Sequence, residues 1–351
     1  MRYLGLERFS GLYLWAIFIL TFGIWEPGLF LTSATLHSVA SEQAVAAMLA
    51  LAVLVPLVAG AYDLSVGSVI NMSAITCVWL QTAEGWSMWA SIGLAVGISA
   101  LVGVVNAFIV VKLQVSSFIA TLGMATIVAA VQTIVSGANQ PLPPTASSWL
   151  NLTQRTFGGF QVIVWYLLIL ALVLWWFLEM TPGGRYMQAT GGNIEAARLS
   201  GVATGFWTAI ALVISAVISG AAGVLYASLS GPALSFGPGL LLPAFAAVFL
   251  GSTQLRPGRF NVWGTVLAVY VLATGVTGFE YVTGAQWLND MFNGVALIVA
   301  VAFAGWRLRA RVSSTRVRTA LETEPDATEI VTDAADGSVD EDSPRPPRRR
   351  R

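Results

Sequence analysis

Residues 183–201 read GGRYMQATGGNIEAARLSG and separate two long apolar stretches of the chain. The segment is polar, contains many residues that favour helices and has glycine at both ends. In so apolar a chain, a polar insert of this length is expected to lie outside a lipid bilayer, where water can form hydrogen bonds with its polar groups. The sequence therefore predicts a helical membrane protein with a short surface helix that is placed to dock a partner protein.

The composition supports a membrane protein and argues against an enzyme. Of the 351 residues, 56% are hydrophobic and only 10% are charged, whereas soluble domains carry about 25% charged residues. With one cysteine (Cys77) and one histidine (His37), the chain alone can form no disulfide framework and no zinc site. We expect no catalytic constellation, no metal, no cofactor and no nucleic-acid partner. The sole lysine, Lys112, follows two valines and so does not belong to a P-loop, which means that any ATP hydrolysis must come from another polypeptide.

A bilayer core requires about 20 apolar residues as a helix, and ten segments come close to this length. The first is interpreted as a retained span, not a cleaved signal peptide, because no small-residue cleavage pattern follows it. Only Ala61, Tyr62 and Asp63 part the second and third segments, and the eighth is short and contains Pro243, so either region could be broken or re-entrant. The segments are roughly 11–31, 41–60, 64–82, 88–111, 116–136, 161–180, 206–227, 240–252, 261–280 and 289–306.

The basic residues set the orientation, because cytoplasmic loops carry an excess of Lys and Arg. With the N-terminus inside, ten alternating spans leave only Arg155 outside. We therefore predict an all-α, polytopic bundle with both termini in the cytoplasm. Residues 1–312 form its transmembrane domain, and 313–351 are predicted to be a disordered, charged tail, since this composition cannot bury a core. Arg348–Arg351 could contact anionic lipid, or the tail could simply aid solubility.

Polar groups within the spans are few, and none of the spans carries a ladder of Asp, Glu or His. This weighs against a proton-driven transporter, whereas sodium coupling through neutral oxygens stays open. Small residues such as Gly93, Gly97, Gly220 and Gly223 are expected to let helices approach closely. Asp63 is expected to cap the helix that follows it.

Four stretches, taken in order, carry a family resemblance. They are Asp63–Ser68 (DLSVGS); Asn106–Lys112 with Phe118–Gly123 (FIATLG); Gly184–Gly201; and Gly264–Thr265. In these stretches the chain resembles the permease subunits of ribose-type (simple sugar) ATP-binding-cassette importers, and the match runs over most of residues 1–306. The resemblance implies a multi-pass protein of the bacterial plasma membrane, surrounded by lipid. It also implies three kinds of partner: a second permease subunit, two ATPase subunits, and a periplasmic or lipid-anchored solute-binding protein.

By this resemblance, residues 183–201 are the segment that couples the permease to its ATPase. Glu195 and Arg198 are spaced to pair on one helix face, Gly191 and Gly192 permit a sharp entry, and Gly201 can end the helix. The coupling residues are Arg185, Gly191, Gly192, Asn193, Glu195, Ala196, Ala197, Arg198 and Gly201. The residues expected to line the translocation pathway are Asp63, Ser65, Asn71, Asn106, Thr121 and Thr265.

Several alternatives stay open at this point. The chain departs from the family pattern around its eighth span, at Leu241 and Pro243, so the resemblance leaves the solute undecided. A branched-chain amino acid permease of the same importer class is one alternative, and a secondary transporter or channel acting alone is another. Residues 183–201 could also be an ordinary cytoplasmic loop helix. The permease could pair with itself or with a related chain.

Overall fold

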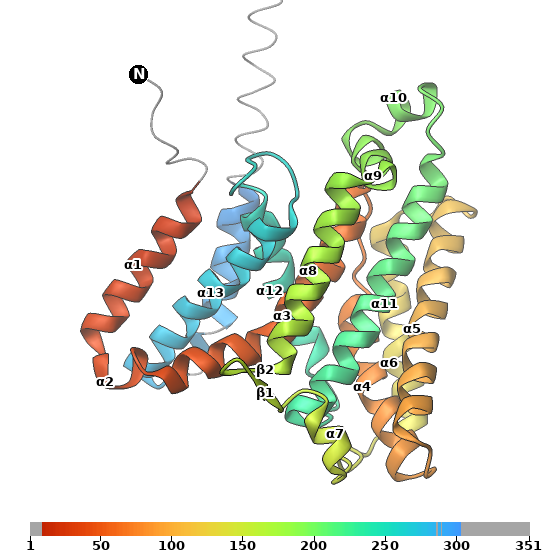
Figure 1. The fold of residues 1–351 in the computed structure, drawn as a ribbon. Coiled ribbons are helices and arrows are strands. Elements are labelled where there is room, and N and C mark those ends of the chain that lie inside the picture. The colour runs from red at the N-terminus through yellow and green to blue at the C-terminus, as the bar shows by residue number, and fades with distance from the viewer. Residues whose placement is uncertain (1–8, 286, 289, 303–351) are drawn as a thin grey trace, which may run out of the picture. The chain divides into compact units, whose positions relative to one another are not determined.

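The computed structural model describes residues 9–285, 287–288 and 290–302, and most of these form helices (Figure 1). A small hairpin of β1 (Thr156–Phe157) and β2 (Phe160–Gln161) pairs antiparallel. The helices are α1 (Ser10–Trp25), α2 (Pro27–Phe30), α3 (Ser33–Val58), α4 (Val66–Thr82), α5 (Met88–Val111), α6 (Ser117–Ser136), α7 (Ser147–Asn151), α8 (Val162–Met180), α9 (Pro182–Gly192), α10 (Ile194–Leu199), α11 (Thr204–Ser230), α12 (Gly237–Gly251), α13 (Val262–Thr283) and a last helix, Asp290–Ala302.

The predicted all-α membrane bundle is confirmed. Among the described residues, six helices are long and apolar enough to cross a membrane, namely α3, α5, α6, α8, α11 and α13. Three shorter apolar helices, α1, α12 and Asp290–Ala302, fall in other predicted spans. The count of ten spans stays a prediction. The first predicted span is broken at Glu26, because Pro27 cannot continue a helix and instead begins α2. The predicted tail, 313–351, lies outside the described residues.

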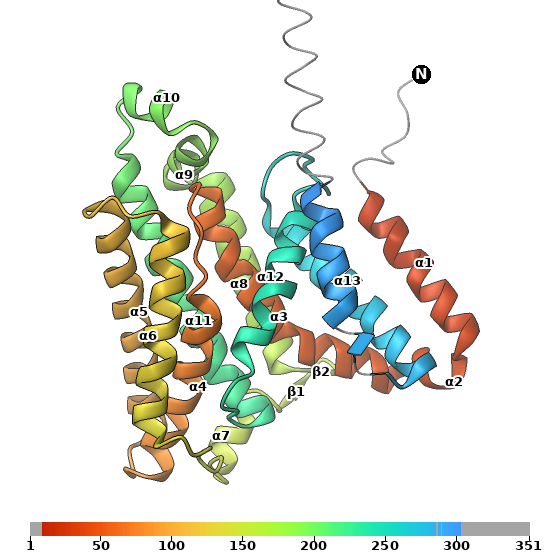
Figure 2. The ribbon, with the colours of Figure 1, turned by 180° about the vertical axis from the view of Figure 1, so that it is seen from behind.

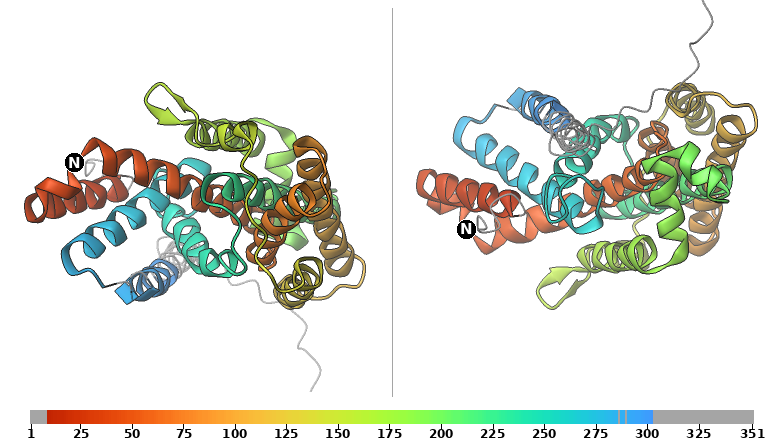
Figure 3. Two further views of the ribbon diagram at one scale, coloured as in Figure 1. Left: turned by 90° about the horizontal axis from the view of Figure 1, so that it is seen from below. Right: turned by 90° about the horizontal axis from the view of Figure 1, so that it is seen from above.

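Helix α3 occupies the centre of the bundle, and its residues from Ala44 to Val58 are almost all buried. It packs against α8, α11, α12 and α13. Helix α3 runs from a group that contains α1 and α13 to a group that contains α4, α5, α6 and α11, and it packs against members of both (Figures 2 and 3). A helix that is apolar all round is stable only when it is enclosed in this way or faces lipid.

Small residues produce close helix contacts, as predicted, but not at every position. A methyl group on Gly103 of α5 would lie 2.8 Å from Ala216 of α11, and Gly220 and Gly223 of α11 lie just as tightly against Ser99 and the carbonyl of Ile70. Glycine is needed where backbones approach this closely. Gly93 and Gly97 of α5 differ, because no described atom lies within 4 Å of a methyl group placed on either residue.

Candidate functional site

The predicted docking segment is not one helix but two, α9 and α10, and Asn193 lies between them. The backbone of Asn193 is extended, and its side-chain oxygen accepts a 3.0 Å hydrogen bond from the Ala196 N–H. Asparagine is among the best residues for beginning a helix in this way. The break therefore has a local sequence signal that the prediction of one helix overlooked. Both helices lie beyond the ends of α8 and α11 (Figure 1).

The start of α9 also follows from its sequence. The Thr181 hydroxyl accepts a hydrogen bond from the Gly184 N–H at 3.3 Å, and Pro182 occupies the first helical position. Proline is well suited to that position because its missing N–H would have had no partner there. Gly201, with φ of +82°, follows α10 in the left-handed conformation expected of a glycine that ends a helix.

Helix α10 presents a mixed charged and apolar surface. Its Glu195 and Arg198 form the predicted pair at 3.3 Å, and their side chains are 71% and 59% exposed. Beside them, Leu199 is 89% exposed and Ile194 is 46% exposed, whereas Ala197 is buried. Asn193, Ala196 and, on α9, Arg185 are exposed too. We call Ile194, Glu195, Arg198 and Leu199 the α10 surface.

A backbone contact joins this segment to the centre of the bundle. Gly191, near the end of α9, lies against Val58 and Gly60 at the end of α3. A methyl group on Gly191 would lie 2.8 Å from the Gly60 nitrogen and closer still to the Val58 carbonyl oxygen. Gly60 needs to be glycine for a second reason, its φ of +78°. Gly192, by contrast, has open space around it.

Immediately after Gly60, the chain is not helical for several residues before α4 begins. Residues 61–64 have no regular secondary structure, and α4 starts partway along α6 (Figure 2). Side chains of α6 satisfy this backbone: Ser117 Oγ accepts from the Tyr62 N–H and Thr121 Oγ1 from the Leu64 N–H, each at 3.0 Å. Non-helical backbone at membrane depth is stable only when the protein satisfies it in this manner.

Asp63 stabilises the same non-helical segment between α3 and α4, but it does not act as the predicted helix cap. Helix α4 begins at Val66 with Ser65 as its N-cap, so Asp63 lies two residues too early. The Asp63 Oδ1 atom instead accepts from the Ser65 N–H at 3.0 Å and from the Ser65 hydroxyl at 2.6 Å. Ser65 Oγ accepts in turn from Asn106 Nδ2 of α5 at 2.9 Å. Asp63 is fully buried, and its Oδ2 atom has no hydrogen-bond partner among the described residues.

The other predicted pathway residues also hold elements together. Asn71 accepts from the Phe236 and Gly237 N–H groups and donates to Gln132 and to the Leu234 carbonyl, which uses its full hydrogen-bonding capacity. The Thr265 hydroxyl donates to the Asn261 carbonyl at 3.0 Å. None of Asp63, Ser65, Asn71, Asn106, Thr121 and Thr265 is more than 2% exposed. Their role in a pathway stays a prediction.

Among the partners in these contacts, Gln132 is a polar residue within a predicted span, whereas Asn261 was not predicted to have a role. Asn261 is the N-cap of α13, and its Oδ1 atom accepts a hydrogen bond from the Gly264 N–H at 2.7 Å. An asparagine before an apolar segment is a helix-start signal that the sequence itself contains. Within the described residues, no group of three or more His, Cys, Asp or Glu could hold a metal ion.

A family model described as "Branched-chain amino acid transport system / permease component" matches residues 35–301. The chain belongs to this permease family. An autoinducer 2 import system permease protein of Photorhabdus laumondii is 30% identical to it over 259 residues, which cover 71% of this chain and 74% of that protein. A protein of the same description from an Enterobacter species is 29% identical over 84% of each chain.

A ribose import permease protein of Escherichia coli is 29% identical over 78% of this permease and 86% of that protein. The resemblance to ribose-type import permeases is thereby confirmed. With its apolar helices, the permease is a multi-pass protein of the bacterial plasma membrane and a transport subunit.

Proposed function

We propose that this permease is the membrane-spanning subunit of an ATP-binding-cassette importer for a sugar or a sugar-like polar solute. Separate ATPase subunits would bind at α9 and α10 and drive it. Relatives named for ribose and for autoinducer 2 favour a small polar solute over the amino acids of the family description. An extracytoplasmic binding protein would deliver the solute, and a second permease subunit would complete the pathway.

The observation that carries the proposal is the α10 surface together with its backbone link to α3. An exposed Leu199, flanked by an exposed acid and an exposed base, offers a partner both an apolar contact and charged hydrogen bonds. Arg198 and Arg185 can each bind a carboxylate in a bidentate manner. An exposed leucine between two charged side chains is therefore better explained as a contact surface for a partner protein than as a surface that only faces water.

The link from this surface to the bundle is short and stiff. If a bound ATPase displaced α9, Gly191 would push directly on Val58 and Gly60, because no side chain lies between the two backbones. The adjoining break is bonded to α5 through Asn106 and to α6 through Ser117 and Thr121. A small shift of α9 would therefore displace α3, α5 and α6 together. A gate that alternates between two states requires such a coupled movement.

A charge exchange tests the docking role. In the double variant Glu195→Lys, Arg198→Glu the two side chains still pair on one face of α10, but each charge offered to the partner is reversed. We expect the protein to reach the membrane in normal amounts and ATP-dependent uptake to be lost. Glu84→Gln is the control, an exposed acid far from α10 in sequence.

Unchanged uptake in the double variant would contradict the docking role. Uptake by the purified permease in liposomes, driven by a solute gradient without any ATPase, would instead favour a transporter that acts alone.

A further inference from the structure

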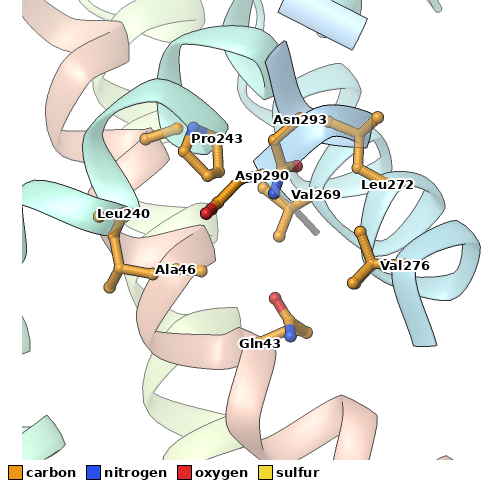
Figure 4. A pocket seen from close by; sticks show the side chains of 12 residues that line it. Gln43, Ala46, Leu240, Pro243, Val269, Leu272, Val276, Asp290 and Asn293 are labelled. Atoms are coloured by element: carbon orange, nitrogen blue, oxygen red, sulfur yellow. The ribbon is translucent and has the colours of Figure 1, made fainter. Parts of the chain in front are cut away.

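A hollow of about 150 Å³ lies between α3, α12, α13 and the helix Asp290–Ala302, apart from the predicted pathway residues. Three polar side chains line it: Gln43 of α3, and Asp290 and Asn293 of the last helix. Figure 4 shows all three around one space, with Leu240 and Pro243 of α12 and Val276 of α13 forming apolar walls. Pockets for drug-sized ligands have about 300–1000 Å³, so this hollow suits a small solute.

Two of the three polar groups at the hollow, Gln43 and Asp290, have unused hydrogen-bonding capacity. Neither the side-chain amide of Gln43 nor the carboxylate of Asp290 forms a hydrogen bond or ion pair with any described residue. A glutamine in an apolar helix of a membrane protein is costly unless it has a partner, and such residues commonly mark substrate pathways. Gln43 is half-buried and Asp290 is exposed, so neither side chain holds helices together and both are available to a ligand.

The hollow lies toward the outer side of the membrane in the predicted orientation. Gln43 belongs to the first half of α3, Leu240 to the first turn of α12, Val276 to the second half of α13, and Asp290 to the start of the last helix. With α9 and α10 in the cytoplasm, these four ends are the outer ones. A solute released by an extracytoplasmic binding protein would meet this hollow early.

We propose that this hollow is a solute-recognition site for a neutral polyhydroxylated molecule of monosaccharide size. A carboxylate accepts hydrogen bonds from neighbouring hydroxyls, and two amides both donate and accept, which matches the two-way character of a hydroxyl. Pro243 and Leu240 would contact the apolar face of a sugar ring. The inference rests on the proposed importer function and narrows its substrate class.

The same chemistry disfavours an amino acid. No Lys or Arg that could pair with the carboxylate of an amino acid occurs among the described residues that line the hollow, whereas a neutral sugar needs no such partner.

The first test measures import by the complete complex of permease, ATPase and binding protein in proteoliposomes, with D-ribose, other neutral five- and six-carbon sugars, and L-leucine as probes. In Asp290→Asn we expect import of the transported sugar to fall by about tenfold, the scale of one lost charged hydrogen bond, and in Gln43→Leu by about fivefold, the scale of one lost neutral hydrogen bond. Both changes preserve side-chain size, so membrane levels and melting temperature should stay normal. Glu84→Gln is the matched control, because Glu84 is an exposed acid that does not line the hollow.

The outcomes separate the two proposals. Wild-type sugar import that persists unchanged in both variants overturns the recognition site and leaves the importer function intact. Wild-type import of leucine and of none of the sugars overturns the sugar assignment and this inference together.

A second test does not depend on the identity of the solute. With Cys77→Ser as background, Gln43→Cys should react with a membrane-impermeant thiol reagent added from outside, whereas Ala44→Cys, at a fully buried neighbouring position, should not. Absence of labelling at position 43 would overturn the site even if sugar is imported.

Discussion

Replacing Gly191 with alanine adds a single methyl group at the contact between the coupling segment and the bundle. The methyl group would lie 2.8 Å from the Gly60 nitrogen, whereas ordinary contacts begin at 3.4 Å, so the two backbones must separate by at least 0.6 Å. The opposing atoms are backbone atoms and cannot rotate away. Overpacking of this kind costs about 1–3 kcal/mol, and we expect a lower melting temperature and reduced ATP-dependent uptake.

The neighbouring glycine provides an unusually close control. Gly192→Ala makes the same chemical change one residue further on, where no atom lies within 4 Å of the new methyl group. Alanine in a helix is favoured over glycine by about 0.5–1 kcal/mol, so this variant should be as stable as the parent or slightly more so, with normal uptake. Thermal unfolding of the purified proteins and uptake into cells check both expectations. Equal behaviour of the two variants would refute the proposed mechanical link.

Further predictions concern the polar contacts that hold the helices together and the α10 surface. Asn71→Leu should lower the melting temperature markedly, because it leaves several buried partners unpaired at about 1–3 kcal/mol each; an unchanged melting curve would contradict this role. Arg256→Gln should cost about 1–3 kcal/mol, because Arg256 lies 2.7 Å from Glu179, whose side chain is only 11% exposed and would retain the hydrogen bond from Trp175; an unchanged melting curve would contradict this. Leu199→Glu should weaken co-purification of the ATPase while stability is retained, and undiminished co-purification would argue against the α10 surface.

Hydropathy was enough to predict the helices, because a lipid environment imposes strong and simple rules on the length of a span. The orientation, which follows from the charges of the loops, stays a prediction. Nine of the ten predicted spans contain an apolar helix in the described residues, the tenth contains the more polar α4, and the surface segment lies where the polar insert predicts. The Glu195–Arg198 pair could also be predicted from the sequence, because it depends only on the spacing of the two residues along a helix.

Features that depend on tertiary contacts were harder to predict. Which glycine of the 191–192 pair touches another backbone is set by the position of α3, and nothing local distinguishes the two. Asp63 has the pattern of a helix cap, yet the helix begins later because Ser65 is bonded to both Asp63 and Asn106. The hollow near Gln43 joins helices that are far apart in sequence, so only the fold brings them together.

The claim that this permease is driven through α10 can be tested most directly by crosslinking in living cells. A photo-crosslinking amino acid at Leu199, the most exposed side chain of the α10 surface, is activated while the complex imports, and the product is identified by mass spectrometry. We predict a covalent adduct with an ATP-binding-cassette ATPase on the cytoplasmic side. An adduct with an extracytoplasmic protein, or import without any ATPase adduct, would contradict the account.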